Sequence, residues 1–141
     1  MDHVVYLDAK AEELKKLICG EKSKIIRGAA GRKMPYGRVS PGDIFYFLDN
    51  DAEGLIKAKA HVQSVINSDM LTKEESINLI KNHQAELQLT ENQMARWSGK
   101  RYLVIIEVDS VEQVEPFRVD KSKYGNMDDW LPVENIDNIR V

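Results

Sequence analysis

Six basic side chains are concentrated in one glycine-rich stretch, residues 20–42. They are Lys22, Lys24, Arg27, Arg32, Lys33 and Arg38. The stretch holds a single acid, Glu21, and therefore carries +5, whereas the 141-residue chain has a formal net charge of −3. The rest of the chain accordingly carries −8, the difference between −3 and +5. A basic patch on an acidic body is typical of a protein that binds an anion at one place. The alternative is a solvated basic loop without a partner.

The residue types in this stretch suit the recognition of a phosphate group. Arg27 offers a planar fork of donors that can pair bidentately with phosphate or carboxylate. The loop 28–41 can cradle a phosphate through backbone N–H groups near its glycines. Further charge and a stacking face for a base would come from Arg32, Lys33, Arg38 and Tyr36. The alternatives are an internal ion pair for Arg27 and a mobile loop without a ligand.

Two other residues are candidates for direct chemistry. The pKa of Lys22 falls if the side chain is buried, which would let it act as a base. Trp130 is a candidate stacking platform, and its neighbours Asn126, Asp128 and Asp129 could read the edge of a base. Against this, tryptophan in a chain of this size is more often a core residue, and Asn and Asp are ordinary turn formers.

The composition argues against several other classes of protein. Cys19 is the single cysteine, and the three histidines show no metal-ligand spacing, so the sequence predicts no metal or other cofactor. No apolar run approaches the roughly 18 residues of a membrane helix, and the N-terminal residues do not resemble a signal peptide. We therefore expect a cytoplasmic protein without a membrane partner. The sequence leaves the oligomeric state open.

The elements that must position these residues fit one domain, residues 1–141. Hydrophobic alternation and β-branched runs predict strands at 3–7, 23–28, 44–48, 55–66 and 100–117. Helical spacing and capping signals predict helices at 9–20, 71–83 and 89–97, and the state of 131–141 stays open. This order predicts an α+β fold, with a curled, mostly antiparallel sheet and short helices at its ends.

The order of these elements resembles the ASCH domain family of the PUA-like superfamily. Members carry a Gly-x-Lys-x-x-x-x-Arg signature after the first helix, matched here by Gly20, Lys22 and Arg27. The Pro-Gly-Asp at 41–43 and a late strand ending in a proline, residues 107–116, are similar as well. The resemblance implies a PUA-like β-barrel with helices at its rim. It also implies binding of RNA or nucleotides in a cleft beside the signature.

Some ASCH members hydrolyse the acetyl amide of acetylated cytidine, with a lysine, a Ser or Thr hydroxyl and a glutamate. By resemblance, Lys22 would be the lysine and Glu86 the nearest glutamate, but Ile25 stands where the hydroxyl is expected. The first hypothesis is therefore a module that binds RNA, another single-stranded nucleic acid, or a nucleotide. The alternative is a small amidohydrolase acting on acylated pyrimidine nucleosides. A third interpretation is an interaction domain whose basic loop is merely solvated.

Overall fold

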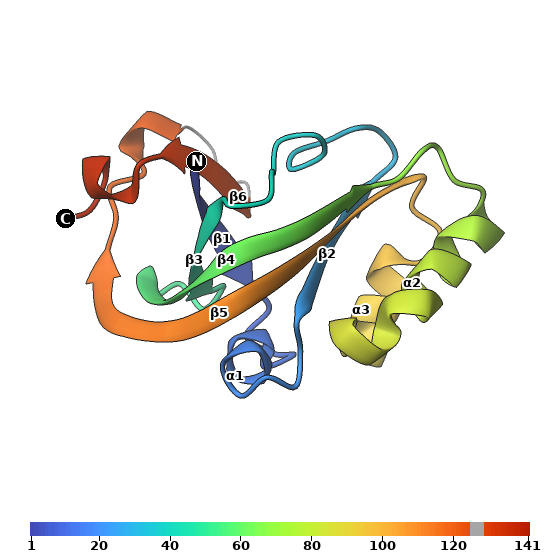
Figure 1. Ribbon diagram of the computed structural model, residues 1–141, viewed down its shortest axis with the longest axis horizontal. Helices are drawn as coiled ribbons and strands as arrows, with labels where there is room; N and C mark the ends of the chain where they lie inside the picture. Colours follow the sequence, from blue (N-terminus) through green and yellow to red (C-terminus); the bar gives the residue numbers. More distant parts are fainter. Residues whose placement is uncertain (125–128) are drawn as a thin grey trace.

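The computed structural model of the chain describes residues 1–124 and 129–141. Within these residues, six strands form a single curled sheet with the order β2-β5-β4-β3-β1-β6 (Figure 1). The strands are β1 (Asp2–Leu7), β2 (Lys24–Ala29), β3 (Ile44–Asp49), β4 (Leu55–Asn67), β5 (Tyr102–Arg118) and β6 (Trp130–Glu134). The helices are α1 (Glu13–Ile18), α2 (Lys73–Leu87) and α3 (Glu91–Trp97), with short 3-10 turns at Ser122–Tyr124 and Ile136–Asn138.

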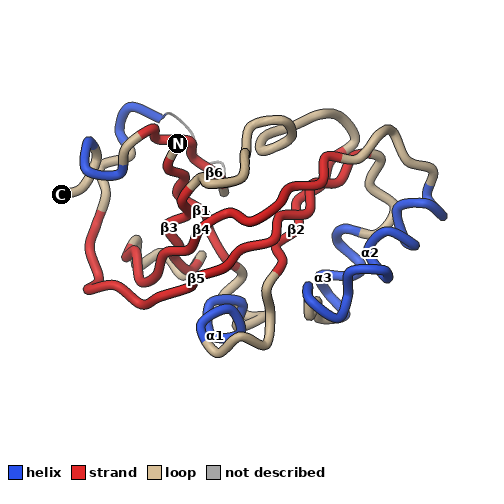
Figure 2. The backbone as a smooth tube through the Cα atoms, viewed as in Figure 1, coloured by secondary structure: helices blue, strands red, loops and turns tan. Residues whose placement is uncertain are grey.

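The sheet is mostly antiparallel, as the sequence predicts. Among its pairings, β1 runs parallel to β3, and the others are antiparallel. The long pair β4 and β5 curves across the molecule and changes register three times, between Ile56 and Ala58, Lys59 and His61, and Val62 and Ser64 (Figure 2). Such irregularities bend and twist a strand, so they allow the sheet to curl into a half-barrel.

The hydrophobic core lies on both faces of this curled sheet. Inside the curl, Phe45, Phe47 and Ala60 pack with Leu17 of α1 and with Trp130. On the other face, α2 and α3 cover β2 and β5 through a cluster of buried apolar side chains. It contains Ile26, Ile80, Leu87, Leu89, Trp97, Leu103 and Ile105. Strand β2 is therefore packed on both faces, and this packing holds its buried polar residue, Arg27, in place.

Most predicted elements are confirmed, and two helices differ in their bounds: α2 continues to Leu87 instead of ending at residue 83, and the first helix begins late. Thr72 and Thr90 each accept from the backbone three residues on, which confirms both helix starts. The first helix begins only at Glu13 instead of near residue 9, because Glu12 adopts a left-handed conformation with φ 55°. Strand β5 is buried on both faces between residues 103 and 106. The segment whose state the sequence leaves open, 131–141, contains most of β6, which pairs with β1.

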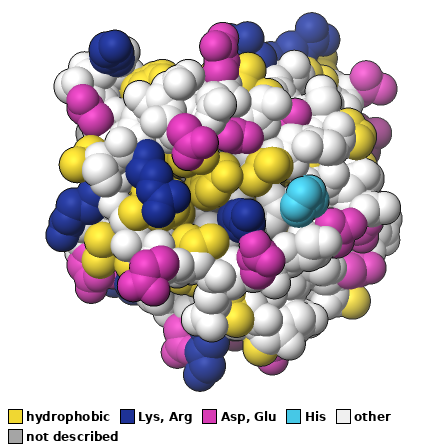
Figure 3. Space-filling model, turned by 60° about the vertical axis from the view of Figure 1, so that its left-hand side comes forward, with side chains coloured by type: hydrophobic (Ala, Val, Ile, Leu, Met, Phe, Trp, Pro, Cys, Tyr) yellow, Lys and Arg dark blue, Asp and Glu magenta, His cyan; other side chains and the backbone are white. Residues whose placement is uncertain are grey.

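The surface mixes charges of both signs. In Figure 3, acidic and basic side chains are interspersed around an area of hydrophobic side chains on the face shown. Among the described residues, no helix is long and apolar enough to cross a membrane. Against this mixed surface, a cluster of side chains with the same charge indicates a candidate binding site.

Candidate functional site

Arg27 is the centre of the candidate site, and its guanidinium group is held by the backbone. The residue is 7% exposed. Its Nη1 donates to the carbonyl oxygen of Ile26 at 2.8 Å, and its Nη2 donates to that of Tyr6 at 2.5 Å. These carbonyls belong to β2 and β1, so two strands fix the plane of the guanidinium group.

The third nitrogen of Arg27 is different, because it has a counter-ion but no hydrogen bond. Nε lies 3.2 Å from Oδ2 of Asp129, close enough for an ion pair. The direction of the contact does not satisfy hydrogen-bond geometry, and among the described residues the buried Nε has no other partner. Asp129 itself is 47% exposed. Arg27 therefore keeps a buried donor whose need an anionic ligand could meet better than Asp129 does.

A compartment of about 160 Å³ lies on the outer side of Arg27 and is strongly cationic. Four basic residues and one acid line it: Arg27, Lys33, Arg96, Lys100 and Asp129. Gly28 also lines it, and a Cβ at this position would lie only 2.7 Å from Cδ2 of Leu103. The wall therefore has no room for a side chain where β2 meets β5. We call this space the outer compartment.

Arg96 and Lys100 are functional candidates that the sequence reasoning missed. They lie four residues apart, on either side of Trp97, at the end of α3 and in the turn that follows. The Arg96 guanidinium group packs 4.4 Å from the centre of the Trp97 ring, which is buried against β2. In the sequence, the signal for these candidates is a pair of cations on either side of an aromatic residue at a helix end. Their position beside Arg27 depends on the packing of α3 and is not visible in the sequence.

A second space of about 110 Å³, the inner compartment, continues from the first. It shares Arg27, Arg96, Trp97 and Asp129 with the outer compartment. Its other walls include carboxylate and amide side chains. The remaining lining residues are Tyr6, Leu7, Asp8, Glu13, Ile26, Asn50 and Gln93. The cleft thus has a cationic outer part and a polar inner part.

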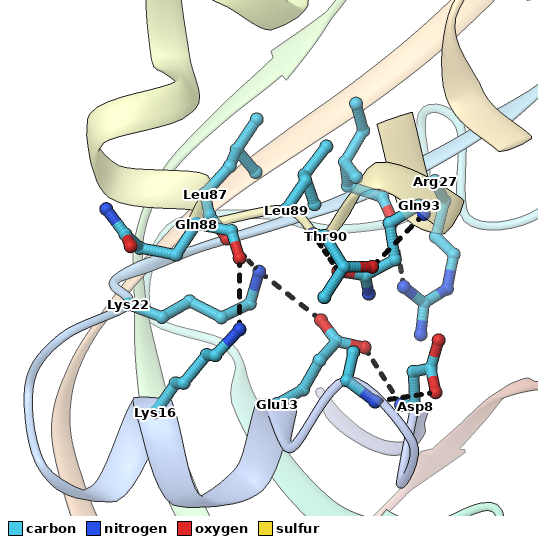
Figure 4. A network of polar contacts seen from close by, with 12 residues as sticks. Asp8, Glu13, Lys16, Lys22, Arg27, Leu87, Gln88, Leu89, Thr90 and Gln93 are labelled. Atoms are coloured by element: carbon cyan, nitrogen blue, oxygen red, sulfur yellow. Dashed lines mark hydrogen bonds and ion pairs between the residues drawn. The ribbon is translucent and has the colours of Figure 1, made fainter. Parts of the chain in front are cut away.

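Lys22 lines neither compartment but lies beside Glu13 of the inner compartment, almost completely withdrawn from solvent. Its side chain is 1% exposed, its Nζ donates to the carbonyl oxygen of Leu87 at 2.5 Å, and the Oε2 of Glu13 lies 3.3 Å away (Figure 4). The other oxygen of Glu13 accepts from the backbone N–H of Asp8 at 2.9 Å. Burial lowers the pKa of Lys22, although the charge of Glu13 opposes this effect.

Lys24 is directed to His83 and Glu86 of α2 rather than to this network. Lys24 Nζ lies 3.0 Å from Nδ1 of His83 and 3.7 Å from Oε1 of Glu86. The structure thus gives Lys22 and Glu86 different partners: the carboxylate beside Lys22 is Glu13, and the amine beside Glu86 is Lys24. All three cations of the signature region, Lys22, Lys24 and Arg27, have a carboxylate neighbour.

Within the part of the chain that the structure describes, the cations of the glycine-rich loop have no carboxylate in ion-pair contact. Among the ion pairs of residues 1–124 and 129–141, none involves Arg32, Lys33 or Arg38. Arg32 packs over the rings of Tyr36 and Tyr102, at 5.7 and 5.6 Å from their centres. The hydroxyl of Tyr36 donates to the carbonyl oxygen of Ser68 at 2.5 Å, which anchors this part of the loop. Lys33 lines the outer compartment, and Arg38 is exposed elsewhere in the loop.

Trp130 occupies the core rather than the surface. It is 1% exposed, and its ring packs edge-on against Phe45 with 4.9 Å between ring centres. Its Nε1 donates to Nδ1 of His3 at 3.1 Å. The Arg27 guanidinium group lies 5.5 Å from the ring centre, so Trp130 supports the site from beneath. Of the polar neighbours that the sequence suggests as base readers, Asn126 and Asp128 lie outside the described residues.

A larger cavity, of about 400 Å³, lies beside α1 but has no excess positive charge. Its two lysines each pair with an acid that also lines it, Lys15 with Glu12 at 3.6 Å and Lys57 with Asp49 at 3.7 Å. In the described part of the chain, no group of three His, Cys, Asp or Glu side chains is arranged to hold a metal ion. The cleft at Arg27 is therefore the better candidate for an anionic ligand, despite its smaller volume.

Comparison with known proteins gives a match in structure but not in sequence. No protein-family description and no curated protein matches the chain. Among solved structures, the crystal structure of ASCH from Zymomonas mobilis superposes with a TM-score of 0.69 at 15% identity, covering 97% of this chain and 90% of that one. This chain has an ASCH-like fold.

Two variants of the Zymomonas mobilis protein give the same result. A tyrosine-to-phenylalanine variant and a serine-to-alanine variant each superpose with a TM-score of 0.69 at 14% identity, covering 93% and 91% of their chains. At this level of identity the likeness establishes the fold. The ASCH-like half-barrel, with α2 and α3 packed against β2, is thus the frame in which the cleft at Arg27 is built.

Proposed function

We propose that the chain binds the phosphate groups of RNA, of another single-stranded nucleic acid, or of a nucleotide in the cleft at Arg27. The observation that supports this most directly is Arg27, whose buried Nε has no hydrogen bond among the described residues and whose side chain lines a compartment with three further cations. A buried, unsatisfied donor is costly to a fold, so its retention favours a role in binding.

The charge available to a ligand comes from Lys33, Arg96 and Lys100, in addition to Arg27. None of these three has a carboxylate within ion-pair distance among the described residues, whereas Lys22 and Lys24 are already paired. Arg32 and Arg38 extend the positive surface along the loop, where a strand of nucleic acid could continue. Phosphate contacts of this kind supply affinity without sequence preference.

A double variant, Arg96→Ala with Lys100→Ala, tests the proposal. Both side chains reach solvent, so we expect the variant to fold. Its affinity for a single-stranded RNA oligonucleotide should fall about tenfold, because two phosphate contacts are lost. The measurement is fluorescence anisotropy. The matched control is Lys15→Ala with Lys81→Ala, which removes two exposed lysines outside both compartments. Equal binding by the cleft variant and the parent would refute the proposal.

The buried Lys22 favours a second candidate function, hydrolysis of acylated pyrimidine nucleosides. A lysine whose pKa is lowered by burial can serve as a base, and Glu13 lies within 3.3 Å to exchange a proton with it. The family resemblance implies Glu86 for this proton transfer, but Glu86 pairs with Lys24. Incubation with a panel of acetylated nucleosides tests the activity. No turnover of any of them would rule it out.

A further inference from the structure

The inner compartment contains an amide group whose orientation is fixed by the start of α3. Gln93 is 5% exposed, and its Oε1 accepts from the backbone N–H of Thr90 at 3.1 Å as part of the capping box. A backbone N–H can donate only to the oxygen of an amide, so the other end of Gln93 must be the NH₂ group. Among the described residues this NH₂ group has no hydrogen-bond partner, although Gln93 lines the compartment.

A second amide group is oriented in the same way at the mouth of the compartment. The Oδ1 of Asn50 accepts from the backbone N–H of Ala9 at 2.9 Å, which leaves its NH₂ group as the available donor. Asp8 provides the complementary acceptor, because its Oδ1 is engaged by the N–H of Ala11 at 3.1 Å and its Oδ2 has no hydrogen bond within the described residues. The compartment thus offers two oriented amide donors and a carboxylate acceptor.

This set of groups does not suit a phosphate. Three carboxylates, Asp8, Glu13 and Asp129, and two cations, Arg27 and Arg96, line the inner compartment, and Arg27 already pairs with Asp129. A phosphate dianion is therefore attracted more strongly to the outer compartment, which has four cations and one acid. A neutral, planar group that carries carbonyl acceptors and an N–H donor would satisfy the two amides and Asp8 together.

We infer that the inner compartment is a base-binding subsite for a carbonyl-bearing nucleobase, and that uracil fits it better than adenine. The inference rests on the proposed function, since the phosphate of the same nucleotide occupies the outer compartment. Uracil presents two carbonyl oxygens on either side of an N–H, which matches two amide donors and one carboxylate acceptor. Adenine has no carbonyl oxygen, and its exocyclic amino group is a donor that cannot accept a hydrogen bond from an amide NH₂. The side of Trp97 closes the compartment beside the base.

The test compares uridine 5′-monophosphate with ribose 5-phosphate and adenosine 5′-monophosphate by NMR titration of the ¹⁵N-labelled protein. We expect uridine 5′-monophosphate to bind about tenfold more tightly than either of the others, because two or three hydrogen bonds are added. The side-chain NH₂ signals of Gln93 and Asn50 should shift with uridine 5′-monophosphate and not with ribose 5-phosphate.

Two conservative variants remove the donors and keep the hydrogen bonds that the fold uses. Gln93→Glu retains the acceptor of the capping box, where glutamate is the usual residue, and Asn50→Asp retains the acceptor for Ala9. In each variant the tenfold advantage of uridine 5′-monophosphate over ribose 5-phosphate should disappear. Asn92→Asp is the control, because it adds the same charge at an exposed position of α3 that lines neither compartment.

The outcomes separate this inference from the proposed function. If neither ribose 5-phosphate nor uridine 5′-monophosphate binds the parent protein, nucleotide binding and the subsite both fail, and binding of RNA is decided separately by the anisotropy titration. If ribose 5-phosphate binds as tightly as uridine 5′-monophosphate, the phosphate site stands and the base subsite is wrong. Equal affinity for the uridine and adenosine nucleotides would likewise contradict the assignment of a carbonyl-bearing base.

Discussion

Asp129 sets the electrostatic balance of the candidate cleft, because it lines both compartments and is the acid beside Arg27. Its carboxylate stands where a phosphate oxygen of a ligand would approach Nε, so ligand and carboxylate compete for the same donor. As a half-exposed partner it contributes little to stability, on the order of 0–1 kcal/mol. In the proposed phosphate site, Asp129 would thus limit the affinity for anions at small benefit to the fold.

Replacing Asp129 by asparagine should therefore strengthen binding. We expect Asp129→Asn to raise the affinity for single-stranded RNA by about three- to tenfold, since one repulsive charge next to the ligand is removed. Fluorescence anisotropy at constant salt measures the change. Asp109→Asn, at an exposed position of β5, is the control for the change in net charge. A loss of affinity in Asp129→Asn, or an equal gain in the control, would contradict the competition.

The Lys22–Glu13 pair is the second contact whose contribution to the free energy of unfolding can be tested at single residues. Both side chains are buried, so removing the lysine leaves an uncompensated carboxylate in the interior. We expect Lys22→Ala to lower the free energy of unfolding by about 3–5 kcal/mol. The double variant Lys22→Ala with Glu13→Gln should recover part of that loss, because the glutamine carries no charge. Urea denaturation of the three proteins measures both effects, and a double variant less stable than Lys22→Ala would contradict the argument.

At the level of elements, His3 connects three neighbouring strands through one tautomer. Its Nδ1 accepts from Trp130 of β6, so its Nε2 must carry the proton and donate to Asp43 Oδ2 at 2.8 Å, just before β3. Protonation would place a hydrogen on Nδ1, opposite the N–H of Trp130. Burial lowers the pKa of His3, opposed by Asp43 and Asp2 and supported by the N-terminal amino group. These strands are therefore held together by a neutral histidine.

This arrangement gives a defined pH dependence of stability. The unfolded chain takes up a proton on His3 near its ordinary pKa of 6.5, whereas the folded protein resists protonation until a lower pH. Between these values the unfolded state binds more protons, so the free energy of unfolding should decrease as the pH falls from 7.5 to 5.5. Urea denaturation measures it in a His83→Gln background, because the pKa of His83 is lowered as well. A constant free energy across this range would count against the assigned tautomer.

The sequence predicts an element well when the contacts that form it lie close together in the chain. The capping boxes at Thr72 and Thr90 and the alternating alanines of β4 are local, and the sequence predicts those elements correctly. The start of α1 is not local, because Glu13 is drawn inward to Lys22 and to the N–H of Asp8. β6 is short, contains Pro132, and pairs with the first strand of the chain, so no nearby signal marks it.

The candidate site follows the same division. Arg27 and Lys33 can be proposed from residue type and spacing within the basic stretch, and the structure brings both to the outer compartment. Arg96 and Lys100 join them only because α3 packs against β2, which local sequence does not reveal. The role of an aromatic residue is equally non-local: Trp130 becomes a core residue through its contact with His3, 127 positions away.

On the scale of the whole molecule, the charge of the chain favours one site over general binding. A net charge of −3 repels nucleic acid from most of the surface, while the outer compartment concentrates four cations around one acid. Binding of a phosphate chain there releases counterions in proportion to the contacts made. The slope of affinity against salt concentration therefore reports the number of cations that contact the phosphates of the ligand.

With four contacts to a single strand, the logarithm of the binding constant should fall with the logarithm of salt with a slope of about −2.8. Between 50 and 200 mM salt this corresponds to about a fiftyfold loss of affinity. The Arg96→Ala, Lys100→Ala variant, with two contacts left, should lose only about sevenfold over the same range. Anisotropy titrations at several salt concentrations give both slopes. Parallel slopes for the parent and the variant would mean that the nucleic acid lies elsewhere on the protein, because removing a cation that meets a phosphate must reduce the number of counterions released.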